Sequence, residues 1–270
     1  MTENTNATIL GGIVLVTGDG PEHHFVAQIL AETLTIRAIL VCDPTPKRNW
    51  RKVLFRNPIQ FLDKLAWKLF LAVIRDGGKR QKAFNETLGQ LSAAFPMNVP
   101  VERVGRPKSG ILTASLKSLS PAIIAVYGTG IIPNIALAQA QLIALNLHTG
   151  VSPQYRGASC AFWPIHNGEP QWLGATVHEC TSALDGGRIF AIRHVALEED
   201  DDLHRIFART VSAGAYAYAE VISKCMSGTS AGTPQDLTHG REYSGSSRGL
   251  ISEVRARRQL KSLAREIKKR

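Results

Sequence analysis

The residue types best suited to chemistry stand at the ends of apolar runs in this 270-residue chain. Asn146 and His148 are two residues apart at the end of the run LIALNLH, so a strand there points both side chains to one face. Open α/β sheets bind ligands at the carboxyl ends of their strands, and a polar pair buried there is costly unless it is satisfied or used. An amide and an imidazole can hydrogen-bond a ligand and move its protons. Taken alone, such a pair is more often structural than functional.

A carboxylate in a similar setting strengthens the case for a site. Asp185 lies in the glycine turn of the motif LDGGRI, just before another apolar run. Between the two motifs, Pro153 and the run Tyr155–Gly157 (YRG) indicate a rigid, non-repetitive loop. We therefore expect an amide, an imidazole and a carboxylate to converge at one edge of a sheet.

Taken in order, these blocks resemble the folate-dependent formyltransferase family, which includes the glycinamide ribonucleotide, methionyl-tRNA and sugar N-formyltransferases. The resemblance covers about residues 12–200 and rests on three blocks. They are NLH followed by Pro153 and YRG, TVH at 176–178 followed by LDGGRI, and the loop from Tyr127-Gly128 to Ile131-Ile132-Pro133.

The resemblance implies that a formyl group passes from 10-formyltetrahydrofolate to a primary amine, without a metal. In the family's pattern, Asn146 and His148 stabilise the developing oxyanion, while Asp185 orients the imidazole and relays the proton of the amine. The chain departs from the family at Gly150, where a serine is usual, and at Ser152 before the proline. These departures put local hydrogen bonds in doubt but leave the three chemical groups in place.

The same resemblance assigns binding residues. The folate is expected beside the loop after the strand at 122–127 and along the loop 180–185. Its predicted contacts are Tyr127, Gly128, Ile131, Ile132, Pro133 and Leu184. The acceptor is expected at the first glycine turn, where a helix N-terminus favours anions, and near the YRG run. Its predicted contacts are Gly18, Gly20, His23, His24, Tyr155 and Arg156. For the two histidines, exposed first-turn positions are an equally good interpretation.

Apolar runs alternate with helical patterns along most of the chain, which predicts an α/β fold. Strands are expected near 12–17, 36–42, 122–127, 142–147, 173–179 and 188–195, and helices near 22–34, 82–95, 134–140 and 201–226. The first strand, its glycine turn and the second strand make a βαβ unit. The predicted architecture is Rossmann-like, with a mostly parallel twisted sheet and helices on both faces, in a catalytic domain of residues 9–226.

Two basic segments accompany this pattern. Residues 44–82 are predicted to be a helical insertion with a helix over 58–75 and a break at Gly77-Gly78-Lys79-Arg80; from Lys47 to Lys82, eleven basic residues against two acidic ones give a net charge of +9. Residues 227–270 are predicted to be a linker and a basic helix, and over 241–270 ten basic residues against three acidic ones give +7. Since the whole chain carries +10, the remaining body is mildly acidic. Such segments pack against the core or a second subunit of a homodimer, or lie on an anionic membrane surface.

Several other classes of protein are disfavoured. The four cysteines form no CxxC pair and no HExxH motif occurs, so neither a zinc site nor a disulfide framework is expected. A GxSxG elbow is absent, which argues against a serine hydrolase. Without a secretory signal or an apolar run that crosses a bilayer comfortably, we expect a cytoplasmic protein that is at most peripheral at the inner membrane face. The final basic helix lacks aromatic side chains for base stacking, so nucleic acid is not the expected partner.

Elimination within the family favours an amino-sugar nucleotide as the amine acceptor. Methionyl-tRNA enzymes carry a sizeable C-terminal β-domain, whereas 44 residues follow Met226 here, and the minimal purine enzyme would not need the segment 47–82. Two alternatives stay open. One is formyl transfer to a purine-pathway or natural-product amine; the other is an inactive formyltransferase-like module that binds a membrane or RNA through its basic segments.

Overall fold

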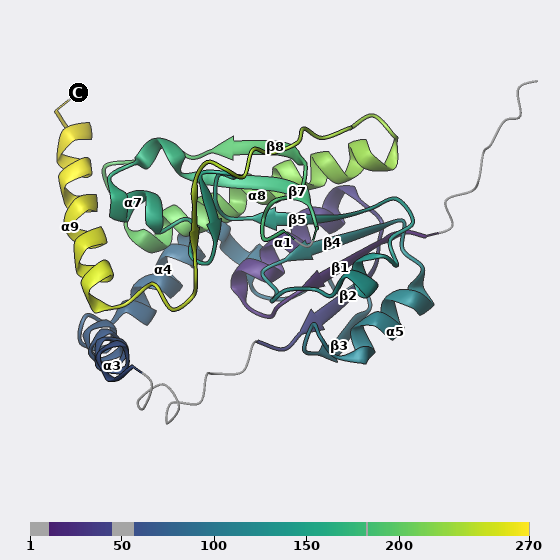
Figure 1. Cartoon of the computed structure of the whole chain (residues 1–270), viewed down its shortest axis with the longest axis horizontal. Helices are drawn as coiled ribbons and strands as arrows, with labels where there is room; N and C mark the ends of the chain where they lie inside the picture. The colour runs from purple at the N-terminus through teal and green to yellow at the C-terminus, as the bar shows by residue number, and fades with distance from the viewer. Residues whose placement is uncertain (1–10, 45–56, 182, 270) are drawn as a thin grey trace, which may run out of the picture.

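A seven-stranded sheet forms the centre of the computed structural model, which describes residues 11–44, 57–181 and 183–269 (Figure 1). The strand order is β3-β2-β1-β4-β5-β7-β8. The strands are β1 (Ile13–Thr17), β2 (Ile36–Cys42), β3 (Val101–Gly105), β4 (Ile123–Tyr127), β5 (Ile143–His148), β7 (Gly174–Glu179) and β8 (Ile189–His194). The first five in sequence are parallel, and β7 and β8 are antiparallel. The predicted α/β fold with a mostly parallel sheet is confirmed.

Helices cover both faces of this sheet because the strand residues alternate between two apolar cores. Leu15 faces a core closed by α1 (Pro21–Thr33), α4 (Asp76–Leu88) and α8 (Leu203–Met226). Its neighbours Val14 and Val16 face the other core, closed by α5 (Gly110–Leu119) and α6 (Asn134–Leu137). The buried strands thus read as continuous apolar runs, as the sequence predicted.

A third apolar cluster joins the C-terminal part of the chain to the body. It includes Trp163 of α7 (Trp163–Asn167), Leu203 of α8, and Ala256 and Leu260 of α9 (Leu250–Ile267). A small parallel sheet, β6 (Tyr155–Gly157) with β9 (Arg241–Tyr243), lies beside this cluster. The remaining helices are α3 (Pro58–Val73) and the 3-10 turns η1 (Gly89–Ser92) and η2 (Pro170–Trp172). In Figure 1, α9 and α3 stand together at one end of the molecule.

The structure corrects the sequence prediction at three helices. The helix expected over 82–95 begins at Asp76, so the predicted break at Gly77-Gly78-Lys79-Arg80 is wrong. Burial of Phe84 and Leu88 in the core of α1 and α8 outweighs the low helix propensity of the two glycines. The sequence prediction has no helix between 105 and 121, where the structure has α5, and α6 ends at Leu137 instead of Ala140. Residues 9–10 of the predicted domain and 45–56 of the predicted insertion lie outside the described residues.

The strand order also explains where a ligand can bind. From β1 the chain proceeds outward to β2 and β3, then returns to β4 on the other side of β1. At such a switch point the two connections leave in opposite directions, which opens a crevice at the carboxyl ends of the strands. Thr17, Tyr127 and His148 end the strands that border this crevice.

A buried tyrosine ties the long helix α8 to this edge of the sheet. The Tyr218 hydroxyl donates to the carbonyl of Leu145 at 2.7 Å and lies 3.2 Å from that of Val126, and its side chain is fully buried. We expect Tyr218→Phe to lower the free energy of unfolding by about 1–2 kcal/mol, because the substitution leaves a buried carbonyl without its donor. Urea unfolding at unchanged m-value measures the effect. Tyr216→Phe, on the same helix but 57% exposed, serves as the control and should change stability by less than about 0.5 kcal/mol.

Candidate active site

A cavity of about 690 Å³ occupies the crevice at the carboxyl ends of β1, β4 and β5. It is lined by the segments that directly follow these strands and by the loop after β7. Asn146, His148 and Asp185 all line it, so the three groups predicted to do chemistry are brought together.

Asp185 is the centre of this group. Its Oδ2 lies 3.5 Å from Nδ1 of His148 and accepts the backbone N–H of Gly157 at 2.7 Å. Its Oδ1 lies 3.3 Å from Nε2 of His178. The carboxylate is only 10% exposed, and the residue holds a left-handed backbone with φ of 49°. Asparagine and aspartate adopt this conformation more readily than most residues.

The protonation of the pair follows from these contacts. Burial by itself would raise the pKa of Asp185, but His148, His178 and the Gly157 N–H together outweigh burial and lower the pKa to about 2. Burial also lowers the pKa of His148, against the opposing effect of Asp185. Near neutral pH the site therefore holds a carboxylate beside a neutral imidazole. Because Nε2 of His148 donates to the carbonyl of Tyr155 at 3.0 Å, its Nδ1 carries the lone pair and faces Asp185.

Asn146 is oriented by a residue that the sequence analysis used only as part of a motif. The ring of His178 donates from Nδ1 to the carbonyl of Glu179 at 2.8 Å, which leaves Nε2 to accept from Nδ2 of Asn146 at 3.1 Å. An amide nitrogen carries two protons, so Asn146 keeps a second N–H for a ligand in the cavity. His178 is 3% exposed and lines the same cavity.

The two departures from the family pattern are accommodated by close packing. Thr176 of β7 donates to the carbonyl of Gly150 at 2.7 Å and accepts the backbone N–H of Ser152 at 3.0 Å, so both residues are pinned to the sheet. A Cβ at Gly150 would lie 2.5 Å from Nε2 of His148 and 2.4 Å from Cβ of Cys160. A side chain larger than glycine therefore does not fit at position 150 beside the imidazole in this arrangement.

The predicted folate-binding loop forms one wall of the cavity. Tyr127, Gly128, Ile131, Ile132 and Leu184 all line it, whereas Pro133 is not among the described residues that do. Ile131 is 69% exposed and Leu184 is 40% exposed, so both offer apolar surface to a ligand.

Cys180 also lines the cavity. Burial raises the pKa of this thiol to about 12, which makes it a neutral side chain and not a nucleophile.

The residues of the first glycine turn divide into two groups. His23 lines the cavity, and its Nδ1 donates at 2.8 Å to the Thr17 hydroxyl, which in turn donates to the carbonyl of Tyr127 at 3.0 Å. A Cβ at Gly18 would come within 2.9 Å of the His23 ring, so only glycine leaves room for the ring at this position. Gly18 itself is not among the described residues that line the cavity. Gly20 caps α1 with a backbone φ of 149°, and it too is not among the described lining residues.

His24 has a structural environment. Its Nε2 lies 2.9 Å from Asp19, its Nδ1 lies 3.2 Å from the carbonyl of Ser92, and its ring meets Phe95 edge-on at 4.4 Å. Both ring nitrogens are engaged within the protein, which favours the alternative that this histidine holds α1 against η1 and the loop that follows.

Tyr155 and Arg156 are not among the described residues that line the cavity. The Tyr155 side chain is 1% exposed in the third apolar cluster, where its hydroxyl contacts Glu169 and Asn167. What Tyr155 contributes to the site is its carbonyl, which accepts from His148. Neither side chain is among the described residues that line the cavity, so the placement gives no support to their predicted contact with the acceptor.

Part of the cavity wall comes from a segment that the sequence analysis described as linker and extension. Residues 242–245, which include the end of β9, line the cavity together with Gly157 and Ala158. The Tyr243 carbonyl accepts the N–H of Ala158 at 2.7 Å, and its ring stacks on Trp163 with centroids 4.3 Å apart. A strand of three residues in a polar stretch has no local sequence pattern that would predict it. That this segment lines the cavity is therefore seen only from the pairing of β9 with β6 in the structure.

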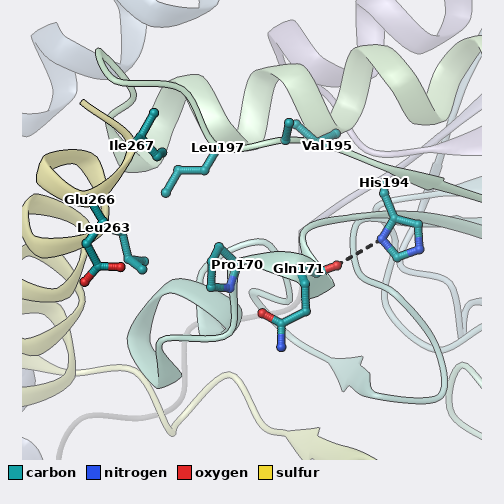
Figure 2. A pocket seen from close by; sticks show the side chains of 9 residues that line it. Pro170, Gln171, His194, Val195, Leu197, Leu263, Glu266 and Ile267 are labelled. Atoms are coloured by element: carbon teal, nitrogen blue, oxygen red, sulfur yellow. Dashed lines mark hydrogen bonds between the residues drawn. The ribbon is translucent and has the colours of Figure 1, made fainter. Parts of the chain in front are cut away.

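A second hollow of about 470 Å³ lies elsewhere, between η2, the end of β8 and α9 (Figure 2). Its walls are mostly apolar, with Val195, Leu197 and Leu263 among them. Nδ1 of His194 donates to the Gln171 carbonyl at 3.1 Å, the hydrogen bond drawn in Figure 2. None of the three predicted catalytic residues contributes to this hollow, so the cavity at the strand ends is the candidate active site.

Comparison with known proteins agrees with the resemblance found in the sequence. Residues 104–222 match the model of the family described as formyl transferase. A curated methionyl-tRNA formyltransferase from Chlorobium chlorochromatii is 29% identical over 144 residues, which cover 53% of this chain and 46% of that protein. The chain thus spans about half the length of this curated relative. The predicted resemblance to the formyltransferase family is confirmed.

Solved structures agree with the fold. The structure from Mycobacterium tuberculosis described as a likely sugar N-formyltransferase superposes with a TM-score of 0.57 at 16% identity and covers 93% of this chain and 87% of that one. The N-formyltransferase from Helicobacter canadensis, solved with folinic acid and dTDP-3-aminofucose, has a TM-score of 0.57 at 12% identity and covers 92% and 80%. At these identities the likeness establishes the fold.

The packing around Gly150 leads to a direct test. We expect Gly150→Ala to destabilise the protein by about 1–3 kcal/mol, because the added methyl group overpacks the contact between His148 and Cys160. Thermal and urea unfolding measure the loss. Gly110→Ala is the matched control, since no atom lies within 4 Å of its Cβ position. Equal stability of the two variants would contradict the packing described here.

Proposed function

We propose that this chain, of the formyl transferase family over residues 104–222, moves a formyl group from 10-formyltetrahydrofolate to the primary amine of an amino-sugar nucleotide. The observation that supports the proposal most is the convergence of Asn146, His148 and Asp185 at one cavity. A carboxylate beside a neutral imidazole and an amide with a spare N–H are suited to acyl transfer to an amine.

The cavity has the character that a folate donor requires. Its volume of about 690 Å³ is in the range of small-molecule sites. Val126, Ile132 and Leu137 supply apolar walls for a planar heterocycle, and the backbone of residues 127–132 can supply donors and acceptors to its edge. In this proposal the donor lies along that wall, with its formyl group toward Asn146.

The first chemical step places demands on Asn146. When the amine nitrogen attacks the formyl carbon, the C=O π electrons move onto oxygen and an oxyanion develops. The second N–H of Asn146, the one not donated to His178, is the donor for that oxyanion. Because His178 holds the amide in place beforehand, the donor needs no reorganisation as charge develops.

The proton of the attacking amine needs an acceptor within the site. Nδ1 of His148 carries a lone pair and faces Asp185, so it can take this proton and become an imidazolium that the carboxylate stabilises. The imidazolium then gives the proton to the leaving nitrogen of the folate as the carbon–nitrogen bond breaks. In this proposal His148 carries the proton, and Asp185 positions the imidazole and stabilises its positive charge.

The nucleotide-linked acceptor is the finer part of the proposal. It draws on the sugar N-formyltransferases that share the fold, one of them solved with dTDP-3-aminofucose. In this chain the cavity is also lined by His23 and by Glu242 and Tyr243 of the C-terminal segment. Glu242 is exposed and can accept hydrogen bonds from sugar hydroxyls or the amine.

One experiment tests donor and acceptor together. The protein is incubated with 10-formyltetrahydrofolate and a panel of amines, and mass spectrometry detects the gain of a formyl group. The panel contains dTDP- and UDP-linked amino sugars, purine-pathway amines and methionyl-tRNA, since the curated relative is a methionyl-tRNA formyltransferase. We expect an amino-sugar nucleotide to be formylated. Formylation of methionyl-tRNA alone would replace the acceptor, and no amine-dependent release of tetrahydrofolate would overturn the activity.

Substitution of Asn146 should act on turnover. We expect Asn146→Ala to lower kcat on the order of 10²- to 10³-fold, because one oxyanion donor is lost. Asn85→Ala, at an exposed asparagine of α4 that is not among the described residues lining the cavity, should retain full activity. Steady-state assay of amine-dependent formyl transfer, with circular dichroism to verify folding, measures both. A value of kcat unchanged in Asn146→Ala would remove this residue from the mechanism.

The pH profile should report on His148. Because burial holds its pKa below the usual 6.5, the acid limb of kcat/KM should fall below pH 6.5, where protonation of Nδ1 removes the acceptor for the amine proton. The Asp185 charge raises the pKa of His148, so Asp185→Asn should move this limb to still lower pH while it lowers kcat. A limb that stays in place, or moves upward, in the variant would exclude His148 as the titrating group.

A further inference from the structure

A row of exposed apolar side chains runs along the outer side of α3. We name it the α3 apolar face and define it as Ile59, Leu62, Leu65, Leu69 and Val73. Their exposed fractions range from 45% for Leu65 to 81% for Val73. Spacings of three and four residues place all five on one side of the helix. From Ile59 to Val73 the row is about 21 Å long, at a rise of about 1.5 Å per residue.

The opposite side of α3 is hydrogen-bonded to α9, so the α3 apolar face points away from α9. Asp63 accepts the backbone N–H of Leu250 at 3.0 Å, and the Trp67 indole N–H donates to Glu253 at 3.3 Å. Lys64 donates to the carbonyl of Arg248. Asp63, Lys64 and Trp67 are therefore turned toward the protein, whereas the five residues of the α3 apolar face are turned outward, the reverse of an ordinary surface helix.

The charges around the face are of one sign. Among the described residues 57–82, every exposed charged side chain is basic; Lys68 flanks the row and Arg75 follows its end. The two acidic residues of the segment point inward: Asp63 caps α9, and Asp76 pairs with Arg257 at 2.5 Å and His204 at 3.0 Å. An apolar face with a cationic border is complementary to an anionic surface that has an apolar interior.

We propose that the α3 apolar face docks this protein on an anionic lipid bilayer, with α3 lying flat in the interface. Among the described residues no helix has the length and apolarity to cross a membrane, so α3 would rest on the bilayer and not span it. The five apolar side chains enter the boundary of the acyl chains, and Lys68 and Arg75 meet the phosphates. A second copy of the chain is the poorer occupant, because it would bring two cationic borders together while the acidic residues of this segment are already paired.

The test uses the full chain and vesicles of defined composition. Wild-type protein should co-sediment with vesicles of phosphatidylcholine and phosphatidylglycerol and much less with phosphatidylcholine alone, and added salt should weaken the binding. Leu62→Glu with Leu69→Glu should reduce the partition coefficient about tenfold or more, since two anchoring side chains are lost. Both positions are exposed, at 59% and 60%, so folding is expected to survive.

A matched control separates the face from net charge. Met97→Glu with Ile111→Glu makes the same charge change at exposed apolar positions outside α3, at 102% and 56% exposure, and should bind vesicles nearly as the wild type does. Equal loss in both double variants, or no binding by wild type, would overturn the proposal. So would a wild-type dimer that Leu62→Glu with Leu69→Glu dissociates in the absence of vesicle binding, which would assign the face to a second copy. Circular dichroism of each variant confirms folding, and formyl transfer to a water-soluble acceptor is an independent measurement.

Discussion

The candidate site depends on a carboxylate held out of water. A buried charge without partners costs several kcal/mol, so Asp185 can occupy its place only if the fold delivers compensating groups to it. The end of β6 delivers the N–H of Gly157, which donates to the carboxylate, while β5 and β7 place His148 and His178 beside it as groups that form a favourable charge pair when they are protonated. Because these imidazoles also contact Asn146 or the Tyr155 carbonyl, the groups that surround the carboxylate also orient the other polar groups of the site. Structural and chemical requirements are therefore met by one set of contacts.

The C-terminal segment belongs to this arrangement. The N–H of Gly157 can meet Asp185 because β6 is fixed in place, and β9 is its partner in the small sheet. Gly157 has a φ of 90°, and a Cβ there would come within 2.3 Å of the Tyr243 carbonyl, so the close pairing needs glycine. The stack of Tyr243 on Trp163 then joins β9 to α7. Residues predicted to be linker and appendage thus support a contact of the candidate site from about 90 positions away in sequence, in keeping with the non-local pairings of sheets.

Sequence reasoning succeeded where a side chain's direction follows from its own strand. Asn146 and His148 share a face because β5 is regular, and the apolar runs identified the strands before and after it. It failed where direction depends on a distant partner. The Tyr155 side chain turns into the third cluster because β6 pairs with β9, and His24 is engaged by Asp19 and Ser92. For α5 a local signal existed, since Leu112 and Leu116 are four apart and both buried, whereas no local pattern indicates that burial of Phe84 keeps α4 helical through two glycines.

The relation between α3 and α9 bears on how the basic segments are used. A surface helix ordinarily turns its apolar side toward the core, so folding alone would be served best by turning Leu62 and Leu69 inward. Instead the inward side carries Trp67, which meets Glu253, a fully buried carboxylate also paired with Arg248. A hydrogen bond to a charged group contributes about 1.5–3 kcal/mol, so the bond from the Trp67 indole to Glu253 favours the observed rotation of α3. The sequence left open whether the insertion packs against the body or a second subunit, or lies on an anionic membrane surface. The hydrogen bonds between α9 and the polar side of α3 leave the apolar side of α3 exposed. Packing of this helix against the body therefore presents the surface that docking on a membrane would use.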